Sequence, residues 1–362
     1  MSQEWYLMPA RITSPGQILK RELDARGWTQ KDLAEILGRP QQAVSEIIKG
    51  AKQITPETAI ELAAAFGTSS ELWNNLEANY RLRLAMQKAD KKAIARKSRI
   101  YGLLPIAEMG KRGWLEVSAS IEDLERQVCA FLGVDSLDEQ PKLAASFRYS
   151  RGKEPETPSQ LAWIKRVEHL ARQKEVASFD ATKLAHAIPA LLHFAERSED
   201  ADKIPMVLKE LGLRLIIVPH LPGTYLDGAA FFLEDKPVVA LSLRYDRIDA
   251  FWFTLMHELA HIIDGRRGAF LDNFDEEAVS AEESVANQRA NDWLLDPRAF
   301  QRFVASTKPY FSREKIVEFA KSQNRHPGIV LGRLQHEGLV PYQNLRSLLT
   351  RISPLLKELI DA

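Results

Sequence analysis

The sequence predicts a mainly α-helical protein with a small β-sheet, an α+β fold. Apolar residues at helical spacing, with capping signals between them, dominate the first 200 residues. After Pro205 the runs LRLIIVPHL, GAAFFL and PVVALSL are typical of short strands separated by turns. Helical patterns return from about residue 277. We expect two functional domains joined by helices, with divisions at 1–80, 81–200 and 201–345 and a C-terminal helix at 346–362.

Composition places the chain among ordinary globular proteins. It has 362 residues, 45% of them hydrophobic and 27% charged, enough for two or three domains. The start, MSQEWYLMPAR, lacks a signal-peptide pattern, and no apolar run reaches the roughly 18 residues of a membrane span. The single cysteine, Cys129, excludes an internal disulfide and a thiolate metal cluster. We therefore expect a cytoplasmic protein without a membrane partner.

Positive charge gathers in one segment, although the net charge of the chain is zero. Residues 81–99, RLRLAMQKADKKAIARKSR, hold eight bases against Asp90 alone. Leu82, Ala85 and Met86 recur at helical spacing, which predicts a helix with one apolar stripe and a basic remainder. Two interpretations stay open, a solvated connecting helix and a helix that contacts phosphate.

Short helices with clear start and stop signals are predicted between Pro15 and Phe66. Thr29, with Asp32 three residues on, caps the segment TQKDLAEILG, which closes at Gly38. The next helix, in RPQQAVSEIIKG, is entered through Pro40. Two helices that cross at a tight turn need small and apolar residues on their inner faces. Four residues meet that need: Ala34, Gly38, Val44 and Ile47.

The outer face of the second helix carries polar side chains that can contact base edges in a major groove: Gln41, Gln42, Ser45 and Lys49. Over residues 12–82 the sequence resembles the lambda-repressor-like helix-turn-helix of HigA/VapI-type antitoxins, a branch of the XRE repressors. The resemblance implies binding to a double-stranded DNA operator as a homodimer. It implies phosphate contacts from Thr29 and Gln30, and base contacts from Arg39, Gln41, Gln42 and Ser45. The alternative is a protein-interaction module without a DNA partner.

The stretch FWFTLMHELAHIID, residues 251–264, places His257, Glu258 and His261 in an almost wholly apolar segment. Histidines four apart project from one helical face and can hold one metal ion, while the glutamate between them is offset toward a water on that ion. Two buried imidazoles without a partner are costly, and a metal ion supplies that partner. The alternative is a pair of core histidines satisfied by backbone carbonyls.

A carboxylate is the expected third ligand, because no histidine lies between His261 and His326. Acidic residues are plentiful at 272–283. Glu283 shares a helical face with small and apolar residues at 286, 290 and 294, where it can approach the first helix closely. We therefore expect Glu283 as the ligand, with Glu282 as the alternative if the helix phase differs by one residue.

Residues 205–340 resemble the ImmA/IrrE metallopeptidase family, through LRLIIVPHLPGTYLDGAAFF, MHELAHIID, EESVANQRANDWLLDP and NRHPGIVLGRLQHEG. The resemblance implies a zincin-like domain that holds Zn²⁺, or another divalent metal such as Mn²⁺. His257, His261 and the glutamate of E-x-x-A-N, Glu283, are the implied ligands, and Glu258 is the implied catalytic base. Arg289 departs from the family pattern, which has a bulky apolar residue at that position.

Several residues around this motif are further candidates. An oxyanion would need a donor, for which we consider His220, Tyr225 and His326. The metal-binding histidines would need orienting partners, for which we consider three residues of the same segment: Asp249, Thr254 and Asp264.

Together these features predict a sequence-specific DNA-binding regulator with a zinc metallopeptidase domain that cleaves itself or another regulator. Self-cleavage is expected within 81–99 or 150–160. The alternative is an antitoxin-type repressor that binds a toxin and has a structural or sensing metal site. A third hypothesis is a peptidase whose helix-turn-helix recruits a protein substrate.

Overall fold

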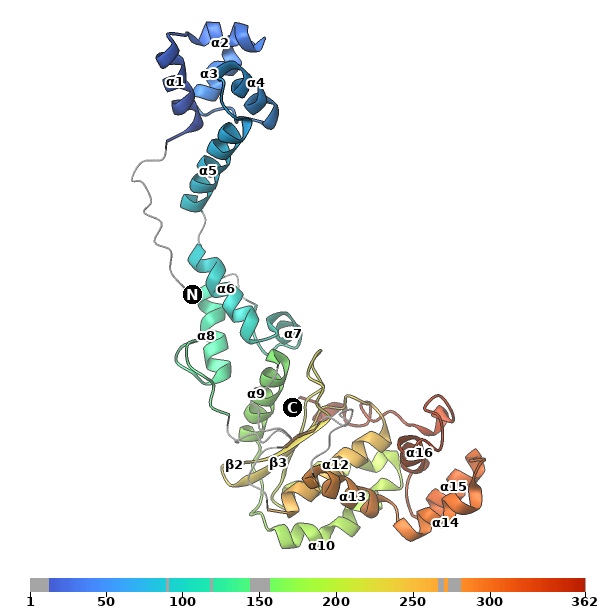
Figure 1. Ribbon diagram of the computed structural model, residues 1–362. Helices are drawn as coiled ribbons and strands as arrows, with labels where there is room; N and C mark the ends of the chain where they lie inside the picture. Colours follow the sequence, from blue (N-terminus) through green and yellow to red (C-terminus); the bar gives the residue numbers. More distant parts are fainter. Residues whose placement is uncertain are drawn as a thin grey trace. The chain divides into compact units, whose positions relative to one another are not determined.

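The computed structural model describes residues 13–88, 91–117, 120–143, 157–265, 270–272 and 281–361. The chain divides into two units, Met1–Arg96 and Lys97–Ala362. We describe each unit by itself, with the element labels of Figure 1. The prediction of a mainly helical protein with a small sheet is confirmed.

The first unit is a bundle of short helices around one apolar core. Its helices are α1 (Pro15–Arg26), α2 (Gln30–Leu37), α3 (Gln41–Ile48), α4 (Pro56–Phe66) and α5 (Ser70–Lys88). Apolar side chains from all of them meet in the core, among them Leu19, Leu33, Val44, Leu62 and Trp73. The predicted cap of α2 is present, because Asp32 N donates to Thr29 Oγ1 at 3.2 Å.

The described residues of the basic segment 81–99 are helical, as the sequence predicts. Residues 81–88 form the end of α5, and α6 begins at Lys91 and runs to Leu103. Residues 89 and 90 lie outside the described residues. Arg81 pairs with Glu77 at 2.7 Å and Arg99 with Asp138 at 2.6 Å, so these two bases are engaged within the protein.

The second unit is built on a four-stranded sheet in the order β1-β3-β2-β4. The strands are β1 (Arg214–Ile217), β2 (Gly228–Leu233), β3 (Lys236–Leu241) and β4 (Phe270–Asp272). β1 and β3 are parallel, whereas β2 is antiparallel to both β3 and β4. Glu234 and Asp235 have φ of 54° and 59°, as the two-residue turn of a β2–β3 hairpin requires.

Helices cover both faces of this sheet, because alternate strand residues point to opposite sides. On β1, Leu215 and Ile217 face one apolar cluster, while Ile216 faces a second cluster. The first cluster includes apolar side chains from seven helices: α10 (Ala181–Leu191), α11 (Ile204–Glu210), α12 (Ile248–Ile263), α13 (Ala281–Leu294), α14 (Pro297–Thr307), α15 (Arg313–Ser322) and α16 (Pro327–His336). The second contains α6, α7 (Ile106–Lys111), α8 (Ile121–Leu132) and α9 (Pro158–Gln173).

The middle of the chain therefore differs from the predicted connector. The two compact units divide between residues 96 and 97. Residue 200, where we predicted a domain boundary, lies within the second unit. Trp163 of α9 is fully buried and donates to Val218 O at 2.7 Å, next to β1. These helices form one layer of the sheet's own core, so they cannot be removed without exposing it.

The predicted C-terminal helix at 346–362 is wrong for the residues described there. Residues 346–361 contain two single-turn 3₁₀ helices, Arg346–Leu348 and Lys357–Leu359, with turns between them. Ile360 bridges to Ile217 at the outer edge of β1, and Asp361 N donates to Ile217 O at 2.7 Å. The apolar residues that suggested a helix, such as Ile352 and Leu356, instead fill the core.

Two further 3₁₀ segments, Leu192–Ala195 and Ser198–Lys203, join α10 to α11. Among the residues that the structure describes, no helix combines the length and the apolar character needed to span a bilayer.

Gly16 provides a test of the packing in the first unit. A Cβ at Gly16 would lie 2.3 Å from Ile48 O and 2.4 Å from Ile47 O, so α1 and α3 touch through their backbones. We predict that Gly16→Ala destabilises this unit by about 1–3 kcal/mol, because the carbonyls must move. Urea unfolding of the full chain, followed by circular dichroism, measures the change.

Gly102→Ala is the matched control, because nothing lies within 4 Å of a Cβ built at Gly102 in α6. That variant should be neutral or slightly stabilising. Equal effects from the two substitutions would contradict the described packing of α1 on α3.

Candidate metal centre and nucleic-acid interface

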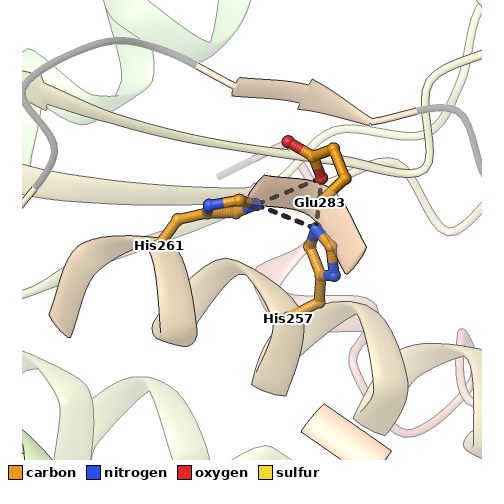
Figure 2. Close-up of side chains that lie close together, drawn as sticks. All are labelled: His257, His261 and Glu283. Carbon is orange, nitrogen blue, oxygen red and sulfur yellow. Dashed lines mark hydrogen bonds and ion pairs between the residues drawn. The ribbon is translucent and has the colours of Figure 1, made fainter. Parts of the chain in front are cut away.

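Three side chains from two helices converge on one point of the second unit (Figure 2). His257 and His261 project from α12, and Glu283 projects from the first turn of α13. His257 Nε2 lies 3.0 Å from His261 Nε2 and 3.1 Å from Glu283 Oε2, and the third pair of atoms is 3.3 Å apart. The histidines are buried, and the glutamate side chain is 12% exposed. The structure thus brings together the three ligands predicted from the sequence.

With Glu283 ionised, hydrogen bonds alone cannot satisfy this triangle. An ionised carboxylate accepts only, so both Nε2 atoms must donate to Glu283. Two donors would then face each other at the 3.0 Å contact between His257 and His261. If either nitrogen accepts instead, it faces the carboxylate as a second acceptor. One of the three contacts is therefore repulsive in each arrangement, whereas a cation at the centre makes all three atoms ligands.

The dimensions of the triangle also fit a metal ion. Zinc binds histidine nitrogen and carboxylate oxygen at about 2.0–2.2 Å in tetrahedral geometry, which separates neighbouring ligand atoms by about 3.3–3.5 Å. The observed separations of 3.0–3.3 Å are close to that range. Three protein ligands leave a fourth position for water or substrate, as a catalytic zinc site requires.

Glu258 follows His257 on α12, and its carboxylate lies against the start of β2. Its side chain is fully buried. A Cβ at Gly228 would lie 2.3 Å from Glu258 Oε1 and 2.7 Å from Thr254 Cγ2. The strand backbone therefore approaches the helix so closely that a side chain at residue 228 would collide with the carboxylate. Gly228 is not among the site residues predicted from the sequence, although a glycine at the start of an apolar strand often marks a close approach of the backbone.

The position of Glu283 depends on how α13 is held against its neighbours. Arg289 of α13 pairs with Asp264, the residue after the end of α12, and its guanidinium lies 5.9 Å from the Trp293 ring. This ion pair links α13 to the end of α12, the two helices that carry the predicted ligands. At the far end of α13, Arg325 donates to Leu294 O at 2.9 Å. The side chain of Glu282, the alternative ligand, lies outside the described residues.

Other candidates near the motif have structural partners. Asp249 pairs with Arg247 and packs against Gly332 of α16, and Asp264 pairs with Arg289, so both carboxylates have partners other than the histidines. His326 caps α16, where its Nδ1 accepts from Gly328 N at 3.0 Å. His220 and Tyr225 are exposed on a loop before β2.

The first unit presents the predicted helix pair, with α2 and α3 joined at Gly38, whose φ is 62°. Gln41 and Gln42 lie in the first turn of α3, are exposed, and are free of the apolar core. Lys49 is exposed at the end of the helix and Ser45 is half-buried. Gln42 Nε2 donates to Glu46 Oε1 at 3.0 Å.

Two predicted DNA contacts have partners inside the protein. Arg39 makes a two-point ion pair with Glu61 of α4, with N–O distances of 2.6 and 3.0 Å. The Thr29 hydroxyl donates to Asp32 Oδ2 at 2.9 Å, and hydrogen bonds from Thr29 lower the pKa of the Asp32 carboxyl. An anionic carboxylate beside Thr29 disfavours a nearby phosphate. Gln30 is half-buried at the start of α2.

The helix pair and its exposed polar face define the first unit as a helix-turn-helix protein. Residues 19–73 match the Helix-turn-helix family model. Through this unit the chain belongs to the XRE family of helix-turn-helix regulators, together with HigA-type antitoxins. The prediction of such a domain is confirmed, and DNA binding with transcription regulation is the function of this unit.

The relatives cover about a fifth of the chain. An uncharacterized helix-turn-helix transcriptional regulator of Haemophilus influenzae is 38% identical over 72 residues, 20% of this chain and 67% of its own length. Antitoxin HigA-1 of Vibrio cholerae is 43% identical over 68 residues, 18% of this chain and 64% of its own length. A solved HigA-family addiction module antidote protein from Coxiella burnetii is 40% identical and matches 23% of this chain and 90% of its own, with a TM-score of 0.22.

Gly228 provides a test of the close approach between β2 and α12. We predict that Gly228→Ala destabilises the second unit by about 1–3 kcal/mol, because the new methyl group meets the Glu258 carboxylate. The same substitution should cost less in a Glu258→Ala background, which removes one of the two clashing groups. Thermal unfolding of the four proteins measures the coupling, and strictly additive effects would contradict the contact.

Proposed function

We propose that this DNA-binding regulator carries a zinc metallopeptidase in its second unit, which cleaves the chain itself or another regulatory protein. The observation that carries the proposal is the triangle of His257, His261 and Glu283, together with the buried Glu258 that follows His257 on the same helix. A purely structural site has no use for a carboxylate held next to the ligands. The position of Glu258 therefore favours catalysis.

The chemistry required is hydrolysis of a peptide bond. A zinc ion bound by the triangle supplies Lewis acidity to the peptide carbonyl and to the attacking water. Glu258 accepts a proton from that water as its oxygen bonds to the carbonyl carbon. It then delivers the proton to the nitrogen as the C–N bond breaks. The absence of a side chain at Gly228 leaves room for the carboxylate against β2.

A peptidase joined to a repressor-like unit suggests a control device. Cleavage within 81–99 would separate the DNA-binding unit from the rest of the chain, whereas a cut within 150–160 would fall inside the second unit. Of the two expected locations, residues 81–88 and 91–99 are helical, and residues 150–156 lie outside the described residues. Peptidases bind extended substrates, so a helical bond must first unwind, whereas an exposed loop is cut more easily.

Metal content and fragmentation test this proposal together. We predict about one zinc ion per chain in the unmodified protein and in Glu258→Gln, because Glu258 is not a ligand. His257→Ala and Glu283→Gln should lose most of the metal. Incubation with zinc and with candidate repressor proteins, followed on a gel, should give fragments only from the unmodified enzyme.

Full metal binding after loss of His257 or Glu283 would overturn the proposed ligand set. Stoichiometric zinc without fragments, in the chain itself and in every protein tested, would overturn the peptidase and favour a sensing or structural metal.

A second candidate function is that of an antitoxin-type repressor with a toxin partner. It is favoured by the 43% identity to a protein named Antitoxin HigA-1. The toxin would then be bound by this chain while its first unit occupies the operator as a homodimer. To distinguish this function from proteolysis, the Glu258→Gln variant is purified together with any protein bound to it. An antitoxin would carry one stoichiometric partner, and the unmodified protein would leave that partner uncut.

The DNA contacts can be tested with an operator selected from random double-stranded DNA by the full chain. We predict that Gln41→Ala weakens binding to that operator by about 1–3 kcal/mol, because a glutamine contact to a base edge is lost. Asn79→Ala, an exposed substitution on α5, serves as the control. Equal affinities for the two variants at one fixed salt concentration would remove Gln41 from the interface.

A further inference from the structure

One face of α12 carries His257 and His261 and continues to Asp264, the residue that ends the helix. Residues four and seven positions after a first residue lie within about 40° of it around a helix axis, and Asp264 keeps helical backbone angles, with φ of −68°. The two histidines meet Glu283 of α13, and Asp264 meets Arg289 of the same helix. The face of α12 that carries the predicted ligands is therefore attached to α13 at two separate points.

The two attachments are spaced alike on both helices. Arg289 follows Glu283 by six residues, which is about 9 Å along α13. Asp264 follows the two histidines by seven and three residues, which is about 5–10 Å along α12. One placement of α13 therefore satisfies both. A single attachment acts as a pivot about which a helix can turn, whereas two attachments at different heights fix its rotation and its axial position.

Arg289 is itself held in place on α13. Its Nη1 donates to Asp264 Oδ1, and its guanidinium lies 5.9 Å from the Trp293 ring, one turn further along the helix. An aromatic face restricts a planar guanidinium, so less side-chain freedom is lost when it pairs with a carboxylate. The arginine and aspartate side chains are 34% and 23% exposed, so solvent screens the pair only in part.

The other contacts of α13 leave room for a small rotation. Ala286 and Ala290 are buried on this helix, and their methyl groups let the backbones approach but resist a small turn only weakly. Arg325 donates to Leu294 O at the far end, about 16 Å along the axis from Glu283. A rotation of about 10° moves an atom at the helix surface by about 1 Å. Metal–ligand distances tolerate only about 0.2 Å, so the ligand needs a second attachment close by.

We propose that Arg289 is a positioning residue for the metal site: by pairing with Asp264, it sets the rotation of α13 that brings Glu283 to the two histidines before a metal ion binds. This inference rests on the metal site of the proposed function, and it identifies a residue that controls metal affinity without contacting the ion. A ligand that is already in place loses less conformational freedom when the ion binds, so the affinity is higher.

Metal affinity tests this role without requiring turnover. Zinc binding to the full chain is measured by competition with a chromophoric chelator, and the ligand set is followed through the visible spectrum of the Co²⁺ form. We expect Arg289→Gln to weaken zinc binding about three- to tenfold, the scale of one partly exposed ion pair together with its ring contact. Its spectrum at saturating Co²⁺ should match that of the unmodified chain, because all three ligands remain.

Two related variants test whether the ion pair carries the effect. Asp264→Asn removes the partner carboxylate and should weaken zinc binding to a similar extent, and the double variant with Arg289→Gln should bind no more weakly than either single variant. Arg289→Lys keeps the positive charge and should recover part of the affinity.

Arg166→Gln is the matched control. Arg166 also pairs with one carboxylate, that of Asp361 at 2.7 Å, and its guanidinium lies 5.6 Å from one ring, that of Trp114. The two side chains of this pair are similarly exposed, at 24% and 21%. Because Arg166 belongs to α9, which covers the other face of the sheet, its loss should leave zinc affinity unchanged.

The Glu283→Gln background separates positioning from general destabilisation. There the two histidines bind zinc only weakly, and the carboxylate that Arg289 positions is absent. Arg289→Gln should therefore cause no further loss of affinity in that background. A general loosening of the fold would weaken binding by the same factor in both backgrounds.

Three results would overturn the positioning role and leave the metal site and the proposed peptidase standing: unchanged zinc affinity in Arg289→Gln, an equal loss in Arg166→Gln, or the same loss with and without the Glu283 carboxylate. If the unmodified chain binds neither zinc nor Co²⁺, the metal site is wrong, and the proposed peptidase and this inference fail with it.

Discussion

The contact between His257, His261 and Glu283 is the constraint on which the second unit depends. Two imidazoles four residues apart on a buried helix meet a carboxylate, and with that carboxylate ionised no arrangement of imidazole protons makes all three contacts favourable. A cation removes the conflict. The apolar side chains around the histidines keep the triangle out of water, and a cation there would interact with its ligands more strongly than in water.

The two-sided sheet supplies the rigidity that this arrangement needs. Alternating strand residues send Ile217 to the α12 side and Ile216 to the α9 side, so both faces are covered. The sheet therefore holds Gly228 against the Glu258 side chain. Helices that look in the sequence like a connector form the second cover. Removing them as a separate domain would expose the back of the sheet on which the site is built.

Local patterns predicted the parts of the structure that local physics decides. Thr29 caps α2, and helical spacing brought Glu283 to the two histidines, because both features depend on neighbours within a few residues. Features that depend on distant partners were missed or mistaken. The C-terminal residues pack as turns because Ile360 pairs with β1, and Arg39, expected at DNA, meets Glu61 of another helix. The need for glycine at residue 228 depends on the Glu258 side chain, which is distant in the sequence and packs against it.

X-ray absorption at the zinc edge of the purified full chain tests the central claim most directly. Binding at the triangle predicts four light ligands at about 2.0–2.1 Å, with the outer-shell scattering of two imidazole rings and no sulfur. Loss of one imidazole signal in His261→Ala would accompany that result. A spectrum of six oxygen ligands without imidazole scattering, or one unchanged in His261→Ala, would contradict the assignment of His257, His261 and Glu283 as the metal ligands.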